Sequence, residues 1–202
     1  MITARHAIAS VVVILTVGCG RAPDRSAAAD SSAAADSSAA MPSPQPAGPS
    51  AGGPAAPSVT EQGIGPLRAG MTLADARTAL GGALVVPPGA DTAGCTYVEW
   101  RGAPPGVRVM VEGSRIARVD VTTPGTATAA GARVGDSEER VMDLYRGRVA
   151  VTPLKYEAGH YLTVTPESRD TSAAIVFEAV KGRIARYRAG LRPQVEYVEG
   201  CG

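Results

Sequence analysis

The sequence predicts an α+β domain made of a duplicated unit, a short helix followed by antiparallel strands, with the helices packed on one face of the sheet. Two observations support this prediction. Three segments recur in the same order, 64 to 68 residues apart, and the apolar spacing in each half changes from the helical period to alternation. The matching segments are residues 68–72 with 133–137, 96–98 with 160–162, and 115–118 with 183–186.

Each half begins with a helix that has its own start and stop signals. Thr72 can cap the first helix with Asp75 three residues later, and Gly81-Gly82 ends it. Ser137 caps the second helix, which ends before Gly147. Apolar residues then fall on one face of each helix, Leu73, Ala76 and Leu80 in the first, and Val141, Leu144 and Tyr145 in the second.

Strands follow each helix. Alternation predicts hairpins around Gly113-Ser114 and near Lys181-Gly182. Earlier strands are expected at residues 83–86, 96–100, 148–152 and 161–165, and a C-terminal strand at residues 196–200. The domain is therefore expected to cover residues 61–202, as repeats at about 63–125 and 128–190 plus that C-terminal strand.

The residues before this domain have the composition of a targeting segment and a tether. Residues 7–17 are apolar apart from Ser10 and Thr16. This run is shorter than the roughly 20 residues that span a bilayer, and it follows a basic start, as in a signal peptide over residues 1–18. In residues 21–60, Ala, Ser, Pro and Gly make up 31 of 40. Residues 19–60 are therefore predicted to be a disordered tether.

Gly18-Cys19-Gly20 ends the apolar run and resembles a bacterial lipobox. This resemblance implies that the Cys19 thiol carries a diacylglycerol and anchors the protein to a membrane of the cell envelope. Gly20, in place of Asp, favours the outer membrane facing the periplasm in a Gram-negative cell. In any other cell the anchor would lie on the outer face of the plasma membrane. The alternative is an ordinary secretory signal cut nearby.

The net charge bears on the class of partner, and the length bears on the number of domains. The 202 residues carry 20 Lys and Arg against 19 Asp and Glu, a formal net charge of +1. Such a balance produces no broad positive field, so no nucleic-acid partner is expected. The length suits one domain with a real core.

The segments 64–72 and 132–137 carry a resemblance to known folds. A Gly followed by a polar helix cap, a short helix, a Gly and a meander, repeated in tandem, is similar to the beta-lactamase inhibitory protein fold. Single copies resemble the small outer-membrane lipoproteins of the SmpA/OmlA type. The resemblance implies binding of another protein through the exposed sheet face, or a place in an envelope assembly.

The cysteines predict a disulfide. Lipidation of Cys19 leaves Cys95 and Cys201, and an even pair in an exported chain favours a bond between them. Two free thiols are the alternative. A metal site with His160 is not expected, because positions 95, 160 and 201 include no close pair of ligands.

No sequence motif of catalysis is present. Residues 61–202 have no Gly-x-Ser-x-Gly, no His-Glu-x-x-His and no Gly-rich phosphate loop. His160 could be written as a pair with Ser168 or Ser172, but a solvent-facing strand residue explains it more simply. We therefore expect neither an enzyme nor a cofactor, although a hydrolase remains a third alternative.

The polar face of the sheet is the remaining candidate site. By alternation, Arg108, Arg118, Arg186 and Arg188 point away from the core. Arginine makes bidentate contacts to carboxylate or phosphate, so this face could bind a partner or be an ordinary solvated face. The expected function is a non-catalytic module that binds a protein or ligand, with an envelope protein as partner. The alternative is a structural component of envelope assembly.

Lipidation can be tested by changing the acceptor. The Cys19→Ser chain should move from the membrane fraction to the soluble extract, because it has no thiol to take the lipid. Fractionation and mass spectrometry of the mature N-terminus measure this. An unchanged membrane fraction, or a mature N-terminus at another residue, would contradict the prediction.

Overall fold

The fold is known from a computed structural model that describes residues 56–168 and 170–201. This part is mostly β, with an eight-stranded antiparallel sheet, a small three-stranded sheet and two short α-helices. This content is compatible with the predicted α+β class. The expected signal peptide, Cys19 and most of the expected tether lie outside the described residues.

The eight strands of the large sheet come from both halves of the chain. The order across the sheet is β4-β5-β6-β7-β11-β10-β9-β8, so β7 and β11 meet in the middle. The bounds are β4 (Leu84–Val85), β5 (Cys95–Trp100), β6 (Val107–Glu112), β7 (Arg115–Val121), β8 (Val149–Pro153), β9 (Gly159–Val164), β10 (Ala173–Val180) and β11 (Arg183–Leu191). Every neighbouring pair is antiparallel.

The two helices begin at the caps that the sequence predicts. α1 (Leu73–Ala79) starts after Thr72, whose hydroxyl accepts the backbone N–H of Asp75 at 3.1 Å. α2 (Glu138–Leu144) starts after Ser137, whose hydroxyl accepts the N–H of Arg140 at 3.2 Å. The predicted apolar stripes pack on the sheet, with Ala76, Val141 and Tyr145 buried. Local capping and periodicity were therefore sufficient to place both helices.

The two central hairpins are also where the sequence predicts them, and each contains a β-bulge. In the β6–β7 hairpin, Ile116 pairs with Val111 and Arg118 with Met110, so Ala117 has no partner. In the β10–β11 hairpin, Ala185 is skipped in the same way. Both bulges fall on the Ala of the Arg-Ile-Ala-Arg sequence that occurs twice in the chain.

The loop before each helix is attached to the same point of the nearby hairpin. The N–H of Gly70 donates to the carbonyl of Ile116 at 2.7 Å, and the N–H of Gly135 donates to that of Ile184 at 2.8 Å. The guanidinium of Arg115 donates to the Gly70 carbonyl, and that of Arg183 to the Gly135 carbonyl. These bonds hold both helices against one face of the sheet.

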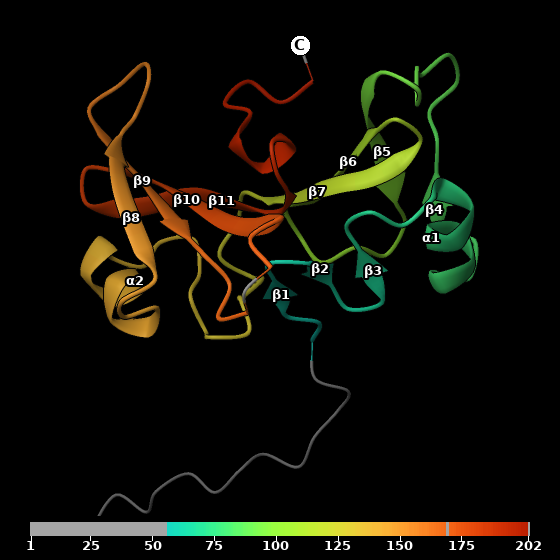
Figure 1. The fold of residues 1–202 in the computed structure, drawn as a ribbon. Coiled ribbons are helices and arrows are strands. Elements are labelled where there is room, and N and C mark those ends of the chain that lie inside the picture. Colours follow the sequence, from blue (N-terminus) through green and yellow to red (C-terminus); the bar gives the residue numbers. More distant parts are fainter. Residues whose placement is uncertain (1–55, 169, 202) are drawn as a thin grey trace, which may run out of the picture. The chain divides into compact units, whose positions relative to one another are not determined.

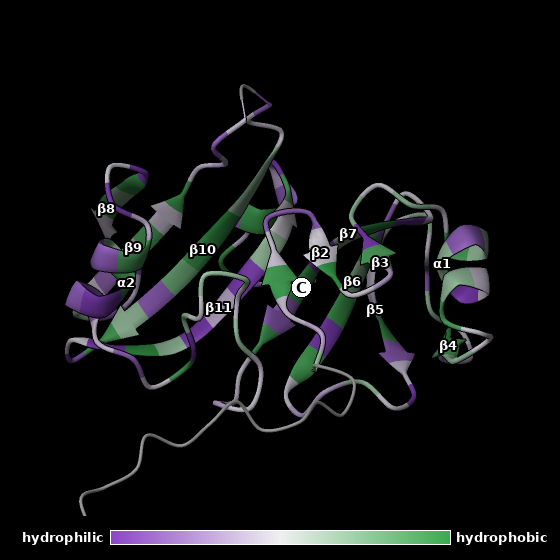
Figure 2. Cartoon of the chain, turned by 90° about the horizontal axis from the view of Figure 1, so that it is seen from below, coloured by the Kyte–Doolittle hydropathy of each residue, from purple (hydrophilic) through white to green (hydrophobic). Residues whose placement is uncertain are grey.

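The helices and the small sheet lie on one face of the large sheet, and the C-terminal segment lies on the other (Figure 1). The main core fills the helix side with residues such as Ile175, Phe177 and Tyr187. β10 is buried over almost its whole length, on both faces. Figure 2, viewed from the helix side, shows that most of this strand is apolar. A strand of this kind needs a cover on each side.

The small sheet shows that the expected boundary of the tether at residue 60 is too late. β1 (Val59–Thr60) pairs with β2 (Gly63–Ile64), which pairs with β3 (Leu67–Arg68). The side chain of Val59 is fully buried, and its backbone exchanges hydrogen bonds with Ala127 and Ala129 at 2.9 and 2.8 Å. One apolar residue after a Pro-rich stretch gives no periodic signal, because its partners lie almost 70 residues later in the chain.

The expected C-terminal strand is wrong. After β11 the chain passes the cis Arg192–Pro193 peptide bond and forms a short 3-10 helix, η1 (Gln194–Glu196). The residues that follow have no strand partner among the described residues. The segment lies on a face of the sheet, where strand pairing is impossible because the backbone groups of a sheet point toward its edges. Within the described residues no helix is both long and apolar enough to cross a membrane.

The buried position of Val59 predicts a sharp boundary for the domain. A chain that starts at Glu61 should lose about 2–4 kcal/mol of unfolding free energy relative to one that starts at Pro57. This decrease has two sources, the burial of the Val59 side chain and its two backbone hydrogen bonds, both of which are absent from the shorter chain. Urea denaturation of the two chains measures the difference. Equal midpoints would show that β1 adds nothing to the fold.

Candidate functional site

The helix-free face of the sheet is crossed by the C-terminal segment, residues 194–201, which we call the strap. The strap begins with η1 and lies over the middle of the sheet (Figure 1). Val195 is fully buried in a small second core with Ala174 and Val176 of β10, against which Tyr161 packs. The strap therefore covers the apolar part of this face.

Arg118 of β7 holds the strap through its backbone. Its Nη1 donates to the carbonyls of Gln194 and Tyr197, both at 2.7 Å. Its Nε lies 3.1 Å from the carboxylate of Asp120, which also accepts the hydroxyl of Tyr97 at 2.8 Å. Burial, followed by the charge of Asp120, raises the pKa of Tyr97, so the phenol remains a neutral donor.

Arg188 of β11 makes the second attachment. Its Nε donates to the carbonyl of Val195 at 2.5 Å, and its Nη1 pairs with the carboxylate of Glu178 on β10. Glu178 is only 1% exposed, and its other oxygen lies 2.5 Å from Nη2 of Arg186. The buried carboxylate is therefore compensated by two guanidinium groups, as a buried charge requires.

A disulfide closes the end of the strap. Cys95 at the start of β5 is bonded to Cys201, with Cα atoms 5.3 Å apart and a sequence separation of 106. Gly200, with φ of +74°, turns the chain toward this bond, and a Cβ there would lie 2.8 Å from the Tyr97 hydroxyl. The strap is thus held by two guanidinium groups and one covalent bond.

A glycine on β11 gives Arg118 room to reach the strap. Gly190 pairs with Arg118, and a Cβ at this glycine would lie 2.5 Å from the Cα and Cβ of Arg118. Any side chain at Gly190 would therefore displace Arg118 or separate β7 from β11. This close approach makes Gly190 a positioning residue for the strap.

The four arginines predicted to share one face do so, but only two of them are accessible. Arg118 and Arg188 are 3% and 4% exposed, so the prediction that they belong to a free binding face is wrong. The strap covers them, and their donors are used by its carbonyls. Arg108 and Arg186 are exposed.

A pocket of about 230 Å³ remains beside the strap on this face, and we call it the arginine groove. All four arginines line it, together with Asp120 and Glu178. With Glu199 of the strap, four guanidinium groups stand against three carboxylates, which leaves an excess of one positive charge. Tyr97 also lines it, with its ring centre 3.8 Å from the guanidinium carbon of Arg108. Val198, Glu199 and Gly200 of the strap form the opposite wall.

A second pocket, of about 260 Å³, lies between the strap and the β8–β9 hairpin. Its lining is more apolar and includes Tyr161, Val176 and Val198. Thr152 and Thr163 supply hydroxyls at its outer side. The strap therefore has a charged groove and a mostly apolar pocket beside it.

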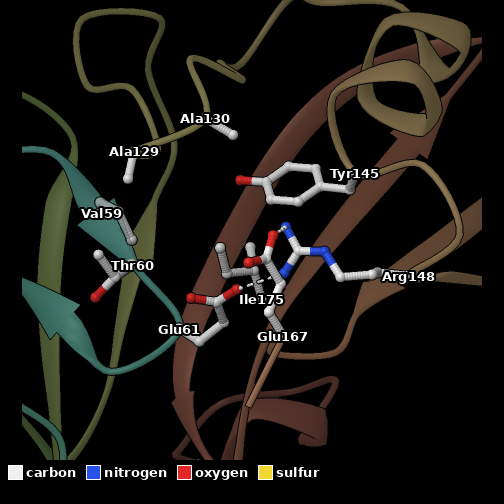
Figure 3. Close-up of a pocket in the computed structure, with 9 residues that line it drawn as sticks. All are labelled: Val59, Thr60, Glu61, Ala129, Ala130, Tyr145, Arg148, Glu167 and Ile175. Atoms are coloured by element: carbon white, nitrogen blue, oxygen red, sulfur yellow. Dashed lines mark hydrogen bonds and ion pairs between the residues drawn. The ribbon is translucent and has the colours of Figure 1, made fainter.

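The helix side has its own pocket, of about 220 Å³, but its charged groups are paired with one another (Figure 3). Arg148 lies 3.4 Å from a carboxylate oxygen of Glu61 and 3.4 Å from one of Glu167. The hydroxyl of Tyr145 donates to Thr128 at 2.7 Å. Because these polar groups bind one another, this pocket offers a ligand less than the arginine groove does.

His160, Ser168 and Ser172, the residues considered for catalysis, each have other hydrogen-bond partners. His160 is exposed on β9 and its Nδ1 lies 2.9 Å from the Glu138 carboxylate at the start of α2. Ser168 and Ser172 bond instead to Asp170. Within the described residues no three His, Cys, Asp or Glu side chains converge as a metal site would require.

Sequence reasoning missed Glu178 and the role of the strap. The signal was present in β10, where the run from Ala173 to Phe177 is apolar without interruption. Such a run indicates a strand that is buried on both faces. A cover for the second face, and a partner for the one carboxylate in the strand, could have been expected from it.

Comparison of the chain with family models, with curated proteins and with solved structures finds no significant match.

The two arginines of the repeated sequence provide a matched test of burial. Arg118→Met should lower the unfolding free energy by roughly 3–5 kcal/mol, because it removes the cation paired with Asp120 and the donor to two strap carbonyls. Arg186→Met, at the corresponding position, should cost about 1 kcal/mol or less. Arg186 is half-exposed, and Glu178 keeps Arg188 as its partner. Denaturant titration of both variants measures this, and equal losses would contradict the assigned roles.

Proposed function

We propose that this chain is an exported, lipid-anchored protein of the cell envelope whose folded domain is a non-catalytic binding module. The observation that carries the proposal is the arginine groove, where Arg108 and Arg186 are accessible on a rigid sheet beside a covalently attached strap. A site on rigid elements holds its donors in a fixed geometry before a partner arrives, which lowers the entropic cost of binding.

We further propose that the domain is an internal duplication. Three features support this origin. Gly70 and Gly135 donate to corresponding carbonyls of the two hairpins, and each hairpin has a bulge, at Ala117 and at Ala185. The strands β7 and β11 of the two halves also pair antiparallel. The two copies then joined into one sheet. The strap, which follows the second copy, lies across their junction.

The targeting part of the proposal rests on the sequence around Cys19 and on the cysteine pair. A disulfide between Cys95 and Cys201 is compatible with an oxidising compartment outside the cytoplasm. A membrane anchor at Cys19 would present the groove to proteins of the envelope. With the anchor, this groove serves as a docking site for one envelope protein.

Site-specific crosslinking in intact cells tests the proposal. A photoreactive residue at Thr122, which is exposed and lines the groove, should capture one discrete partner. The control is the same residue at Arg77, which is exposed on α1, on the opposite face. The partner should be absent from the control, because the helix side does not contact it.

Capture of the same protein from both positions would contradict a binding face at the groove. Absence of any product from Thr122 would contradict the binding module itself. Capture of several subunits of one membrane complex would favour a structural role in envelope assembly.

A further inference from the structure

We propose that the arginine groove recognises an acidic side chain of a partner protein, with the carboxylate held between Arg108 and Arg186. This inference rests on the proposed function and names the chemistry of the partner. It is carried by the difference between the two buried and the two accessible guanidinium groups of this face.

The buried pair shows what this face does with arginine. Arg118 and Arg188 bind three carbonyl oxygens of the strap, those of Gln194, Val195 and Tyr197. Guanidinium groups on this sheet therefore already bind the oxygens of a peptide segment lying across it. The same donor geometry fits a carboxylate still better, since charge-assisted hydrogen bonds are roughly twice as strong as neutral ones.

Arg108 is held in place without being neutralised. Its guanidinium carbon lies 3.8 Å above the centre of the Tyr97 ring, and a stacked arginine keeps the edge of its plane free to donate. No ion pair among the described residues includes Arg108. It is therefore a free cation whose orientation is set by Tyr97.

Arg186 is accessible and only partly neutralised. Its side chain is 51% exposed, and the carboxylate that it contacts, Glu178, is shared with Arg188. One carboxylate between two guanidinium groups leaves a net positive charge at this point. Arg186 therefore has donors to offer to a second carboxylate.

The register of the sheet puts Arg108 and Arg186 within reach of one ligand. Arg108 pairs with Asp120, Asp120 pairs with Arg188, and Arg186 lies two residues from Arg188 on β11. Two strand spacings and a two-residue offset put the Cα atoms of Arg108 and Arg186 roughly 12 Å apart. Two long side chains that line the same groove from this separation can meet at one carboxylate.

The one acidic residue of the strap at this groove is already engaged. The carboxylate of Glu199 accepts a hydrogen bond from the Tyr156 hydroxyl and lies 3.5 Å from Nζ of Lys155. The Tyr156 hydrogen bond, with the charge of Lys155, lowers the pKa of Glu199. Its negative charge is therefore balanced from the β8–β9 loop.

The size of the groove favours a side chain over a free small molecule. Its volume of about 230 Å³ is below the roughly 300–1,000 Å³ of pockets that enclose a ligand. One acidic side chain fits this space, and the rest of its chain can then lie on the strap and the adjacent apolar pocket. The partner is accordingly a protein with an exposed Asp or Glu on a loop or extended segment.

Three capped octapeptides on the full chain, with its disulfide intact, test the proposal. The peptides alternate Gly with Glu, Gln or Lys, and calorimetry measures their affinity at low salt. The Glu peptide should bind at least 10-fold more tightly than the Gln peptide, and the Lys peptide should not bind. Higher salt should weaken the Glu peptide, because the attraction is screened.

Variants locate the binding site. Arg108→Gln and Arg186→Gln should each weaken the Glu peptide about 10-fold, and the double variant should abolish binding. Arg146→Gln is the matched control, because Arg146 is 82% exposed and follows α2 on the helix side. This control should leave the affinity unchanged. Denaturant titration should show that each variant still folds.

Equal binding of the Gln or Lys peptide, absence of Glu-peptide binding, or binding retained by the double variant would overturn the proposal. Such a failure is distinguishable from failure of the proposed function. Crosslinking at Thr122 reports on any partner of the groove, whatever its charge.

Discussion

The structure depends on the closure of the helix-free face by the strap. The strand β10 has almost no exposed side chain, and the helices cover only one of its faces. The other face carries Ala174 and Val176 beside the charged Glu178. Val195 covers the apolar part, and Arg188 both neutralises the carboxylate and holds the strap above it. Because one short segment meets both needs, the disulfide at its end stabilises the whole face.

This closure also divides the arginines by function. Arg118 and Arg186 occupy the same place in an identical four-residue sequence, each directly after a β-bulge. Arg118 lies under the strap and is part of the fold, whereas Arg186 lies beside the strap and stays accessible. A single strap on the sheet therefore puts these two identical four-residue sequences in different surroundings. The asymmetry creates the groove on which the proposed recognition rests.

The features that sequence reasoning placed correctly are local. Thr72 and Ser137 cap helices through contacts three residues away, and the two hairpins close over two-residue turns. The errors concern segments whose partners are distant in the chain. β1 lies in the segment predicted to be tether, because its contacts come from residues near 128. The local pattern of residues 196–200 predicts a strand, but the carbonyls of the strap accept hydrogen bonds from Arg118, 76 and 79 residues away. Spacing and periodicity carry no information about such contacts.

Sequence reasoning was sufficient for both helices, the central hairpins and the set of arginines that share one face. These follow from capping, turn geometry and alternation, which act within a few residues. Tertiary packing establishes which of these arginines are buried, where the domain begins, and how the C-terminal segment lies on the sheet. The physical reason is that burial depends on what covers a surface. Here the cover is a segment without periodicity, held by Arg118, Arg188 and a disulfide to Cys95 on β5.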